Sequence, residues 1–392
     1  MRIGIITGEY PPLEGGVGDF TRELSRTLHA HGHEIHILTG GERATTPTRE
    51  DDLHIYRQIA SWDWGSYPKI TRWARQIAPD VLNIQYQAAA YQMRATINLY
   101  PRWQRRRLPA PVVVTYHDLL PPYLFPKAGP LRQWAVWQLA SHADGVITTN
   151  GPDYTRLITA LEQDKRPPTR LIPIGSNIAP KIPTNYDRDA WRARYGIAPD
   201  ALLIGFFGFL NRSKGVEALL DALAQLQNAG LPAHVLFIGG RTGSSDPTNA
   251  AYAAEIEARA EALGITARVH HTGFITPTEV SASLLASDIC ALPYRDGASL
   301  RRGTLHACLA HGRPIITTTP QSAVDELQHG KNVHLIPPED ATALAEAIRT
   351  LWEAPEMREE LGKGAAALAQ EFSWERIAAR TAEFFRSLKR VA

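Results

Sequence analysis

Cations and glycines that directly follow apolar runs are the residues best suited to chemistry in this sequence. The segment Asn211–Gly215 (NRSKG) comes after the apolar run at 202–210, and Arg301–Thr304 (RRGT) opens a stretch with helical spacing. Guanidinium and ammonium groups beside free backbone amides bind phosphate oxygens well, so both segments predict an anion site. Taken alone, the first segment is equally compatible with a solvated basic loop. The alternative for the second is an exposed helix start with two solvated arginines, and there we favour the anion site.

A glycine-rich loop and a histidine are two further candidates. GGVG at 15–18 follows the first apolar run, and glycines there let backbone amides approach a phosphate. The pair His117–Asp118 follows VVVTY at 112–116, where an imidazole can exchange a proton or bond a sugar hydroxyl. A tight turn and a loop-capping histidine are the alternatives without a ligand. The loop lacks the G-x-G-x-x-G spacing of nicotinamide dehydrogenases, which counts against that class.

Short apolar runs alternate with helical patterns along the whole chain, which predicts parallel, doubly wound sheets. Phe20, Leu24 and Leu28 share one face of a helix, and so do the leucines within 216–226. Ligands of such sheets bind beyond the carboxyl ends of the strands, where the candidate residues lie. The predicted strands cover 3–6, 34–39, 81–85, 112–116, 145–149, 202–210, 234–239, 269–273, 288–293 and 314–318.

Two Rossmann-like domains are expected, because the strand–helix pattern restarts after a proline-rich segment at 172–184. We assign residues 1–175 to an N-terminal domain and residues 176–373 to a C-terminal domain. Residues 374–392 are predicted to form a helix that crosses back to the N-terminal domain. Two such domains would face a central cleft, and 392 residues suffice for them at about 150 residues per domain.

Composition excludes several classes of protein. The 42 Lys+Arg residues are balanced by 40 Asp+Glu residues, so the net charge of +2 argues against a dedicated nucleic-acid binder. Two cysteines cannot build a disulfide framework or a multi-cysteine zinc module. The apolar runs are too short for a membrane span, and the first ten residues do not resemble a signal peptide. We therefore expect a cytoplasmic protein.

A basic cluster and several aromatic residues in the first half bear on partners. The cluster comprises Arg102, Arg105, Arg106 and Arg107 around Trp103. We favour a solvated loop for it, and the alternatives are weak peripheral contact to an anionic membrane and contact to an acidic acceptor. Aromatic side chains can stack on sugars or fill cores, and both alternatives stand for Trp62, Trp64, Tyr67, Tyr86 and Tyr91. The acceptor is therefore left open among a sugar, a lipid-linked compound and a small molecule.

The order of these motifs resembles that of the retaining, GT-B-fold glycosyltransferases of family four over essentially the whole chain. The matching segments are GGVG (15–18), TYHD (115–118), IPIGSNI (172–178), FGFLNRSKG (207–215), HTGFIT (271–276), ASDICALPY (286–294), AHGRPIITT (310–318) and FSWERIA (372–378). Each segment is short, and their order and spacing carry the resemblance. It implies an α/β protein of GT-B type that transfers a sugar from a nucleotide-diphosphate sugar to an acceptor hydroxyl, with retention.

The resemblance also implies that no metal or other cofactor is used. The charge of the leaving diphosphate must then be met by protein cations and backbone amides. Gly16 and Lys214 would lie against the diphosphate, and His117 would contact a hydroxyl of the reacting sugar. Phe274 and Ile275 would lie near the nucleobase.

Two positions depart from the family pattern. Phe209 stands where the family usually has an arginine, so we expect Arg212 to supply that cation. Ser299 and Ala307 stand where the family carries two glutamates, and Asp296 is expected to replace the first of them. The ribose contact that the second glutamate makes in the family cannot be made by an alanine.

The sequence thus predicts a metal-independent retaining glycosyltransferase. The alternative is a non-catalytic protein of the same fold that binds sugar nucleotides and has lost the glutamate pair. The predicted catalytic residues are His117 and Asp296. The predicted donor-binding residues are Gly15, Gly16, Arg212, Lys214, Phe274, Ile275, Ser299, Arg301, Arg302, Gly303 and Thr304.

Overall fold

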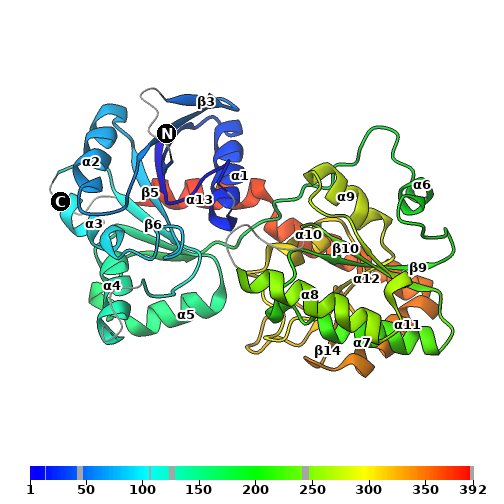
Figure 1. The fold of residues 1–392 in the computed structure, drawn as a ribbon. Helices are drawn as coiled ribbons and strands as arrows, with labels where there is room; N and C mark the ends of the chain where they lie inside the picture. The colour runs from blue at the N-terminus through cyan, green and yellow to red at the C-terminus, as the bar shows by residue number, and fades with distance from the viewer. Residues whose placement is uncertain (14, 42–46, 106, 123–128, 241–246, 389–392) are drawn as a thin grey trace. The chain divides into compact units, whose positions relative to one another are not determined.

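The computed structural model describes residues 1–13, 15–41, 47–105, 107–122, 129–240 and 247–388 (Figure 1). Its contacts divide the chain into two compact units, each with its own sheet. Unit 1 comprises Met1–Gly175 together with Trp374–Ala392, and unit 2 comprises Ser176–Ser373. Among the described helices, none is long and apolar enough to cross a membrane.

The sheet of unit 1 has the strand order β3-β4-β2-β1-β5-β6-β7-β8. Neighbouring strands pair in parallel, except for the antiparallel pair of β3 and β4. The strands are β1 (Arg2–Thr7), β2 (Glu34–Gly40), β3 (Thr48–Glu50), β4 (Leu53–Ile59), β5 (Val81–Tyr86), β6 (Val112–Tyr116), β7 (Gly145–Thr148) and β8 (Thr169–Leu171).

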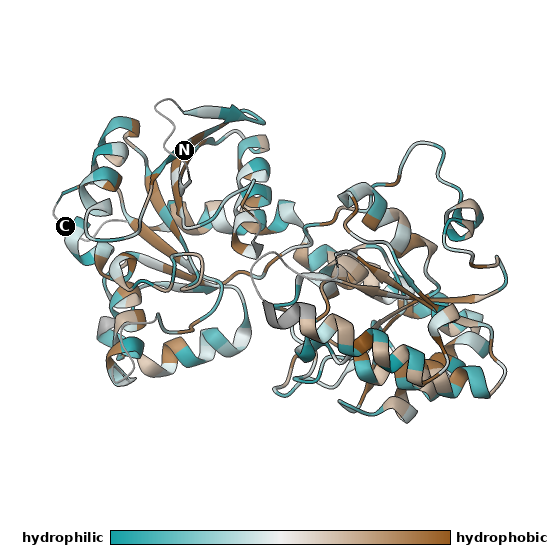
Figure 2. Ribbon diagram, in the orientation of Figure 1, coloured by the Kyte–Doolittle hydropathy of each residue, from teal (hydrophilic) through white to brown (hydrophobic). Residues whose placement is uncertain are grey.

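Helices cover both faces of this sheet, because both faces carry apolar side chains. One face packs on α2 to α5, and the other packs on α1 and α13. Figure 2 shows the apolar strands at the centre, with helices around them whose outer faces are more polar. The helices are α1 (Gly16–Ala30), α2 (Ser66–Ile77), α3 (Thr96–Gln104), α4 (Gly129–Ser141), α5 (Gly151–Ala160) and α13 (Trp374–Ser387).

Helix α13 belongs to unit 1 although it follows the whole of unit 2 in the sequence. Its apolar stripe, which includes Phe384 and Phe385, is buried against the face that α1 also covers. The Trp374 ring meets the Phe20 ring of α1 with centroids 5.2 Å apart. Gly145 allows this close packing, since a Cβ atom there would lie 2.8 Å from Leu388 Cδ1.

Unit 2 contains a sheet with the order β11-β10-β9-β12-β13-β14, all of whose pairs are parallel. Helices α7, α8 and α11 pack on one face, and α6, α9, α10 and α12 pack on the other. The strands are β9 (Leu202–Phe207), β10 (Ala233–Ile238), β11 (Val269–His271), β12 (Ile289–Leu292), β13 (Ile315–Thr318) and β14 (His334–Ile336). The helices are α6 (Arg188–Ala193), α7 (Val216–Asn228), α8 (Pro247–Ala262), α9 (Pro277–Ala286), α10 (Gly303–Ala310), α11 (Ala341–Glu353) and α12 (Pro355–Ala369).

The predicted fold class, an α/β protein with two Rossmann-like parallel sheets, is confirmed. The run at 202–210 was predicted as one strand, but β9 ends at Phe207. Gly208 follows with a φ of 117°, which breaks the extended conformation. The sequence did not predict β3, β4, β8 or β14.

Candidate functional site

Lys214 lies at the carboxyl edge of the unit 2 sheet, in a short 3-10 turn between β9 and α7. Its side chain is buried, and burial lowers the pKa of Lys214 to about 8, with a further lowering from the nearby Arg302 charge. A Cβ atom on Gly208 would lie 2.1 Å from Lys214 Nζ and 2.8 Å from Thr304 Cγ2. Glycine is therefore required at position 208 for the ammonium group and the start of α10 to lie side by side.

The N-terminus of α10 completes this cation group. Arg302 is the residue that precedes the helix, and its guanidinium lies 4.1 Å from the centre of the Tyr294 ring. Thr304 Oγ1 is hydrogen-bonded to the Tyr294 hydroxyl at 2.7 Å, which fixes the first turn of the helix. Lys214, Arg302 and the first amides of α10 thus gather at one strand edge, an arrangement suited to an anion.

The remaining residues predicted between β12 and the first turn of α10 differ in their contacts and in their exposure. Asp296 is ion-paired with Arg302, so its carboxylate partly neutralises the cation group. Ser299 Oγ accepts a hydrogen bond from the Arg301 amide at 3.3 Å, and the Arg301 side chain is exposed. Gly303 leaves open space, because a Cβ atom there would meet nothing within 4 Å.

Arg212 and the nucleobase candidates lie at the surface of unit 2. The Arg212 guanidinium donates to both carboxylate oxygens of Glu255, at 2.7 and 2.6 Å, and lies 5.3 Å from the Tyr252 ring centre. Its charge is thus engaged by a carboxylate. Phe274 is 82% exposed and Ile275 is half-buried.

In unit 1, the glycine-rich loop binds a carboxylate of the protein itself. Glu9 Oε1 accepts hydrogen bonds from the amides of Val17 and Gly18 at the start of α1, at 3.0 and 3.2 Å. A Cβ atom on Gly15 would lie 2.1 Å from Glu9 Oε1, whereas Gly16 faces open space. Burial raises the pKa of Glu9 while the two amides oppose that shift. Glu9 was not among the residues predicted from the sequence, although an acidic residue between β1 and a glycine loop is a signal for such a contact.

His117 follows β6 and is half-buried in unit 1. Its Nε2 lies 2.9 Å from Gln85 Oε1, and the Phe20 ring meets the imidazole edge-on with centroids 4.7 Å apart. Burial lowers the pKa of His117 to about 3, so the ring is neutral at physiological pH. Asp118 is bound locally, since it accepts hydrogen bonds from the Leu120 amide and from Gln87 Nε2.

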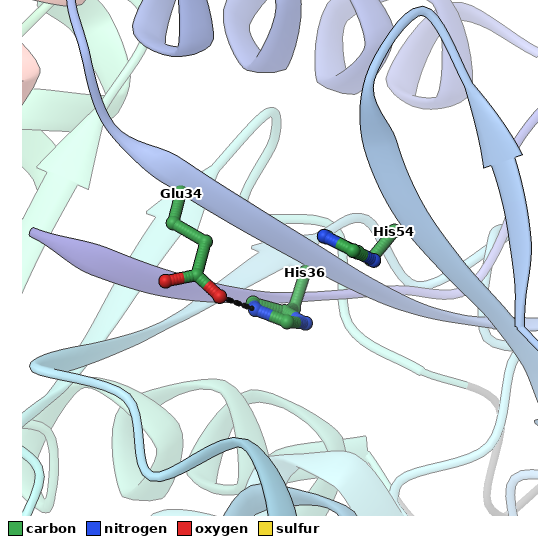
Figure 3. Close-up of side chains that lie close together, drawn as sticks. All are labelled: Glu34, His36 and His54. Atoms are coloured by element: carbon green, nitrogen blue, oxygen red, sulfur yellow. Dashed lines mark hydrogen bonds and ion pairs between the residues drawn. The ribbon is translucent and has the colours of Figure 1, made fainter.

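Among the described residues, one group has the ligand types of a metal centre. Glu34, His36 and His54 present ligand atoms that lie within 4.8 Å of one another on β2 and β4 (Figure 3). The two imidazoles are stacked 4.7 Å apart and only 11° from parallel. An ion must lie in the plane of each imidazole that ligates it, which two stacked rings do not allow. Instead, Glu34 bonds His36 Nε2 and Arg2 Nε, each at 2.9 Å.

A hollow of about 500 Å³ lies at the opposite edge of the unit 2 sheet, near the amino ends of β12 and β13. Its lining includes three arginines that are already engaged by the protein. Arg313 and Arg358 donate to backbone carbonyls, and Arg188 pairs with Asp288. This hollow is therefore a weaker candidate for an anion site than the carboxyl edge of the sheet, where Lys214 lies.

Some of the aromatic and basic side chains singled out in unit 1 are buried and others are exposed. Of the aromatic residues considered for an acceptor, Trp64 is 62% exposed, and the buried ones are Trp62, Tyr67, Tyr86 and Tyr91. The Arg107 guanidinium stacks on Trp103 at 4.0 Å, and the Arg102 and Arg105 side chains are exposed. Arg106 lies outside the described residues, and membrane contact by this cluster remains a prediction.

Two family models match the chain. "Glycosyl transferases group 1" matches residues 187–367, and "Glycosyl transferase 4-like domain" matches residues 15–175. A similar curated protein is the D-inositol 3-phosphate glycosyltransferase of Rhodococcus erythropolis, 28% identical over 65% of this chain and 56% of its own length. The chain thus spans little more than half of that relative. The Jonesia denitrificans protein of the same name is 24% identical over 93% of this chain and 89% of its own length.

Solved structures align with this chain over the residues of both units. Sucrose-phosphate synthase from Thermosynechococcus elongatus aligns with a TM-score of 0.75 and 22% identity over 99% of each chain. Anabaena HepE in complex with UDP aligns with a TM-score of 0.76 and 20% identity over 99% of this chain and 100% of its own. At this level of identity, the likeness establishes a common fold, which is GT-B.

Proposed function

The chain belongs to the glycosyl transferases of group 1, and we propose that it moves a sugar from a nucleotide-diphosphate sugar to an acceptor hydroxyl. The bond between the anomeric carbon and the diphosphate oxygen breaks, and a bond from that carbon to the acceptor oxygen forms. The acceptor proton passes to the leaving diphosphate. We further propose that the anomeric configuration is retained, with departure and attack on the same face of the sugar.

The observation that carries this proposal is the cation group at the carboxyl edge of the unit 2 sheet. Lys214 is buried beside the N-terminus of α10 and Arg302, and it forms no ion pair with a carboxylate of the described residues. Burial of an ammonium group is costly unless an anion compensates it, and a leaving diphosphate supplies that charge. Unit 2 is therefore the donor-binding unit of the proposal, with protein groups rather than a metal meeting the diphosphate.

His117 has a second role in the proposal, at the reacting sugar. It is neutral, half-buried and follows a parallel strand, the place where ligands of such sheets bind. A neutral imidazole contacts a sugar hydroxyl without adding charge near the positive anomeric centre of the transition state. Unit 1 is then the acceptor-side unit, and its acceptor is one of a sugar, a lipid-linked compound or a small molecule.

Asp296 is a weaker candidate for a catalytic carboxylate. Its carboxylate is ion-paired with Arg302, one of the cations proposed to bind the diphosphate. Asp296 is therefore better suited to orient that arginine than to act on the sugar. The amides of Val17 and Gly18 are occupied by Glu9, and the proposal therefore uses only Gly16 of the glycine loop for the diphosphate.

The experiment that tests the proposal is a calorimetric screen of UDP-, GDP- and ADP-sugars, followed by product analysis with the donor that binds. UDP is the first nucleotide to try, because the Anabaena protein of the same fold was solved with it. Failure of all three classes to bind would overturn the proposal. Binding without transfer to any sugar, lipid or small-molecule acceptor would favour the alternative, a sugar-nucleotide binder without catalysis.

A further inference from the structure

Beneath His117 lies a chain of buried polar side chains that the proposed function does not use. Asn83 and Gln85 lie on β5, and Thr115 lies on the neighbouring strand β6. The strands pair so that Asn83 faces Val113 and Gln85 faces Thr115. Asn83 and Gln85 are fully buried, on the sheet face where Val81 and Val113 contribute to an apolar cluster. Polar groups inside such a face require a specific set of hydrogen bonds.

In this series of side chains, a backbone carbonyl determines which atom of each hydrogen bond donates and which accepts. The Val113 carbonyl oxygen can only accept, so the Asn83 group 3.3 Å from it must be the amide nitrogen Nδ2. The same nitrogen donates to Thr115 Oγ1 at 3.0 Å. Asn83 Oδ1 is thereby directed at the Gln85 side chain.

The direction continues through Gln85 to the imidazole. Since Asn83 presents an oxygen, Gln85 must donate to it with its own nitrogen Nε2. Gln85 Oε1 is then the atom that faces His117 Nε2, at 2.9 Å. An amide oxygen can only accept, so His117 Nε2 must carry a hydrogen.

We propose that Asn83 and Gln85 are positioning residues that hold His117 in the tautomer protonated on Nε2. The other ring nitrogen, Nδ1, then carries a lone pair and makes no hydrogen bond with any described residue. His117 accepts a hydrogen bond from a hydroxyl of the bound ligand through Nδ1 and cannot donate one there. The ligand as a sugar rests on the proposed function, whereas the tautomer rests on the hydrogen bonds alone.

The opposite tautomer does not fit this surrounding. It would bring the Nε2 lone pair to within 2.9 Å of the Gln85 oxygen, with no hydrogen between them. Turning the Gln85 amide would bring its oxygen against Asn83 Oδ1, and turning Asn83 would bring two oxygens together at Val113. The backbone carbonyl therefore controls the proton position on a ring four residues further along the chain.

The first experiment measures the tautomer directly. The full chain is labelled with ¹⁵N-histidine, and long-range proton–nitrogen spectra are recorded at pH 7 without ligand. The His117 signals are identified by their loss in His117→Gln. We expect a protonated Nε2 and an unprotonated Nδ1. A ring protonated on Nδ1, or on both nitrogens, overturns the proposal, and this result is independent of any transferase activity.

The second experiment asks whether Gln85 causes this state. Gln85→Glu places a carboxylate beside the imidazole, and an opposite charge raises the pKa of His117. The neutral ring is then lost as the pH falls toward the raised pKa, so we expect the acid limb of the transfer rate to move to higher pH by one unit or more. Gln76→Glu makes the same charge change on the exposed surface of α2 and should leave the profile unchanged.

A third variant covers the case in which Gln85→Glu does not fold. Gln85→Met keeps the length of the side chain and removes the acceptor, so His117 should populate both tautomers in the nitrogen spectra. With the donor that binds, kcat should fall roughly ten- to hundredfold with little change in KM for the donor. An unchanged tautomer ratio in this variant overturns the role of Gln85. An absence of turnover in the wild-type protein would instead count against the proposed function.

Discussion

Lys214 is the residue whose burial most needs a ligand. We expect Lys214→Met to weaken binding of the nucleotide diphosphate identified in the screen by about 1.5–3 kcal/mol, which is roughly ten- to hundredfold in Kd. The reason is the loss of a charged hydrogen bond, while the apolar stem of the side chain is kept. Calorimetric titration measures the change.

Lys363 provides the matched control for that experiment. It is an exposed lysine on α12 whose ion pair with Glu359 lies at the surface. Lys363→Met should leave the Kd unchanged. An equal loss of affinity in both variants would mean that Lys214 acts through the general charge of the chain and does not contact the diphosphate.

The pH dependence of nucleotide binding follows from the same side chain. Because burial lowers the pKa of Lys214 to about 8, its ammonium form is present below that pH and is lost as the pH rises through it. We expect the affinity for the nucleotide diphosphate to be full near pH 7 and to weaken above pH 8. The measurement is Kd from pH 6.5 to 9.5. Lys214→Met should show no such weakening over the same interval, and a parallel decline would contradict the assignment.

His117 should separate catalysis from donor binding. His117→Ala removes the contact to the reacting sugar but none of the cations of unit 2, so transfer should fall to background while the donor Kd changes less than threefold. Product formation and calorimetry on the same preparation measure the two quantities. Wild-type turnover in this variant would remove His117 from the mechanism.

At the residue scale, the sequence predicted the polar side chains that follow a strand, but it did not predict which residues form hydrogen bonds or ion pairs with them. Lys214 and Arg302 could be predicted because a strand end and a helix start are visible as local patterns. Gln85 and Asn83 were missed because their roles depend on the register of β5 against β6, about 30 residues away in the chain. Arg212 was expected at the diphosphate, but its guanidinium binds Glu255, a partner on α8 that no local pattern indicates.

Among the elements, α13 has the clearest energetic consequence. Phe384 and Phe385 bury their rings in the face of the unit 1 sheet that α1 also covers. Phe384→Ala should destabilise the protein by about 3–5 kcal/mol, because it removes a buried aromatic ring and leaves a cavity. Denaturant unfolding followed by tryptophan fluorescence measures the loss. Glu383→Ala, an exposed change on the same helix, is the control and should cost little.

The elements that the sequence missed share a physical reason. Strand β4 mixes buried residues with half-buried polar ones, including His54 and Arg57, so its polar positions weaken the apolar signal. Strands β3, β8 and β14 have three residues each, which is too short for periodicity. The central strands were predicted correctly because helices cover both of their faces, which leaves an almost unbroken apolar run.

On the scale of the whole molecule, the two units have separate apolar cores. Because the proposed nucleotide site lies in unit 2, ligand should raise the stability of that unit directly. Differential scanning calorimetry should resolve two components, and nucleotide at 100 times its Kd should stabilise one of them by about 2.7 kcal/mol. In Lys214→Met at the same nucleotide concentration the stabilisation should fall to about 0.4–1.4 kcal/mol, because that concentration is then only about one to ten times the weakened Kd. An equal shift of both components would contradict the assignment of the site to unit 2.

The position of α13 in the sequence also governs the order in which the ribosome can complete the two units. All the strands of unit 1 emerge first, yet the helix that covers one face of their sheet is synthesised after the last residue of unit 2. Unit 2 is contiguous and can fold while unit 1 still exposes apolar side chains such as those around Ile5 and Ile147. A nascent chain stalled before Trp374 would therefore carry a sheet with one face covered by α1 alone, and chaperones and proteases recognise such exposed apolar surface. Synthesis of α13 thus completes the helical cover of that face of the unit 1 sheet.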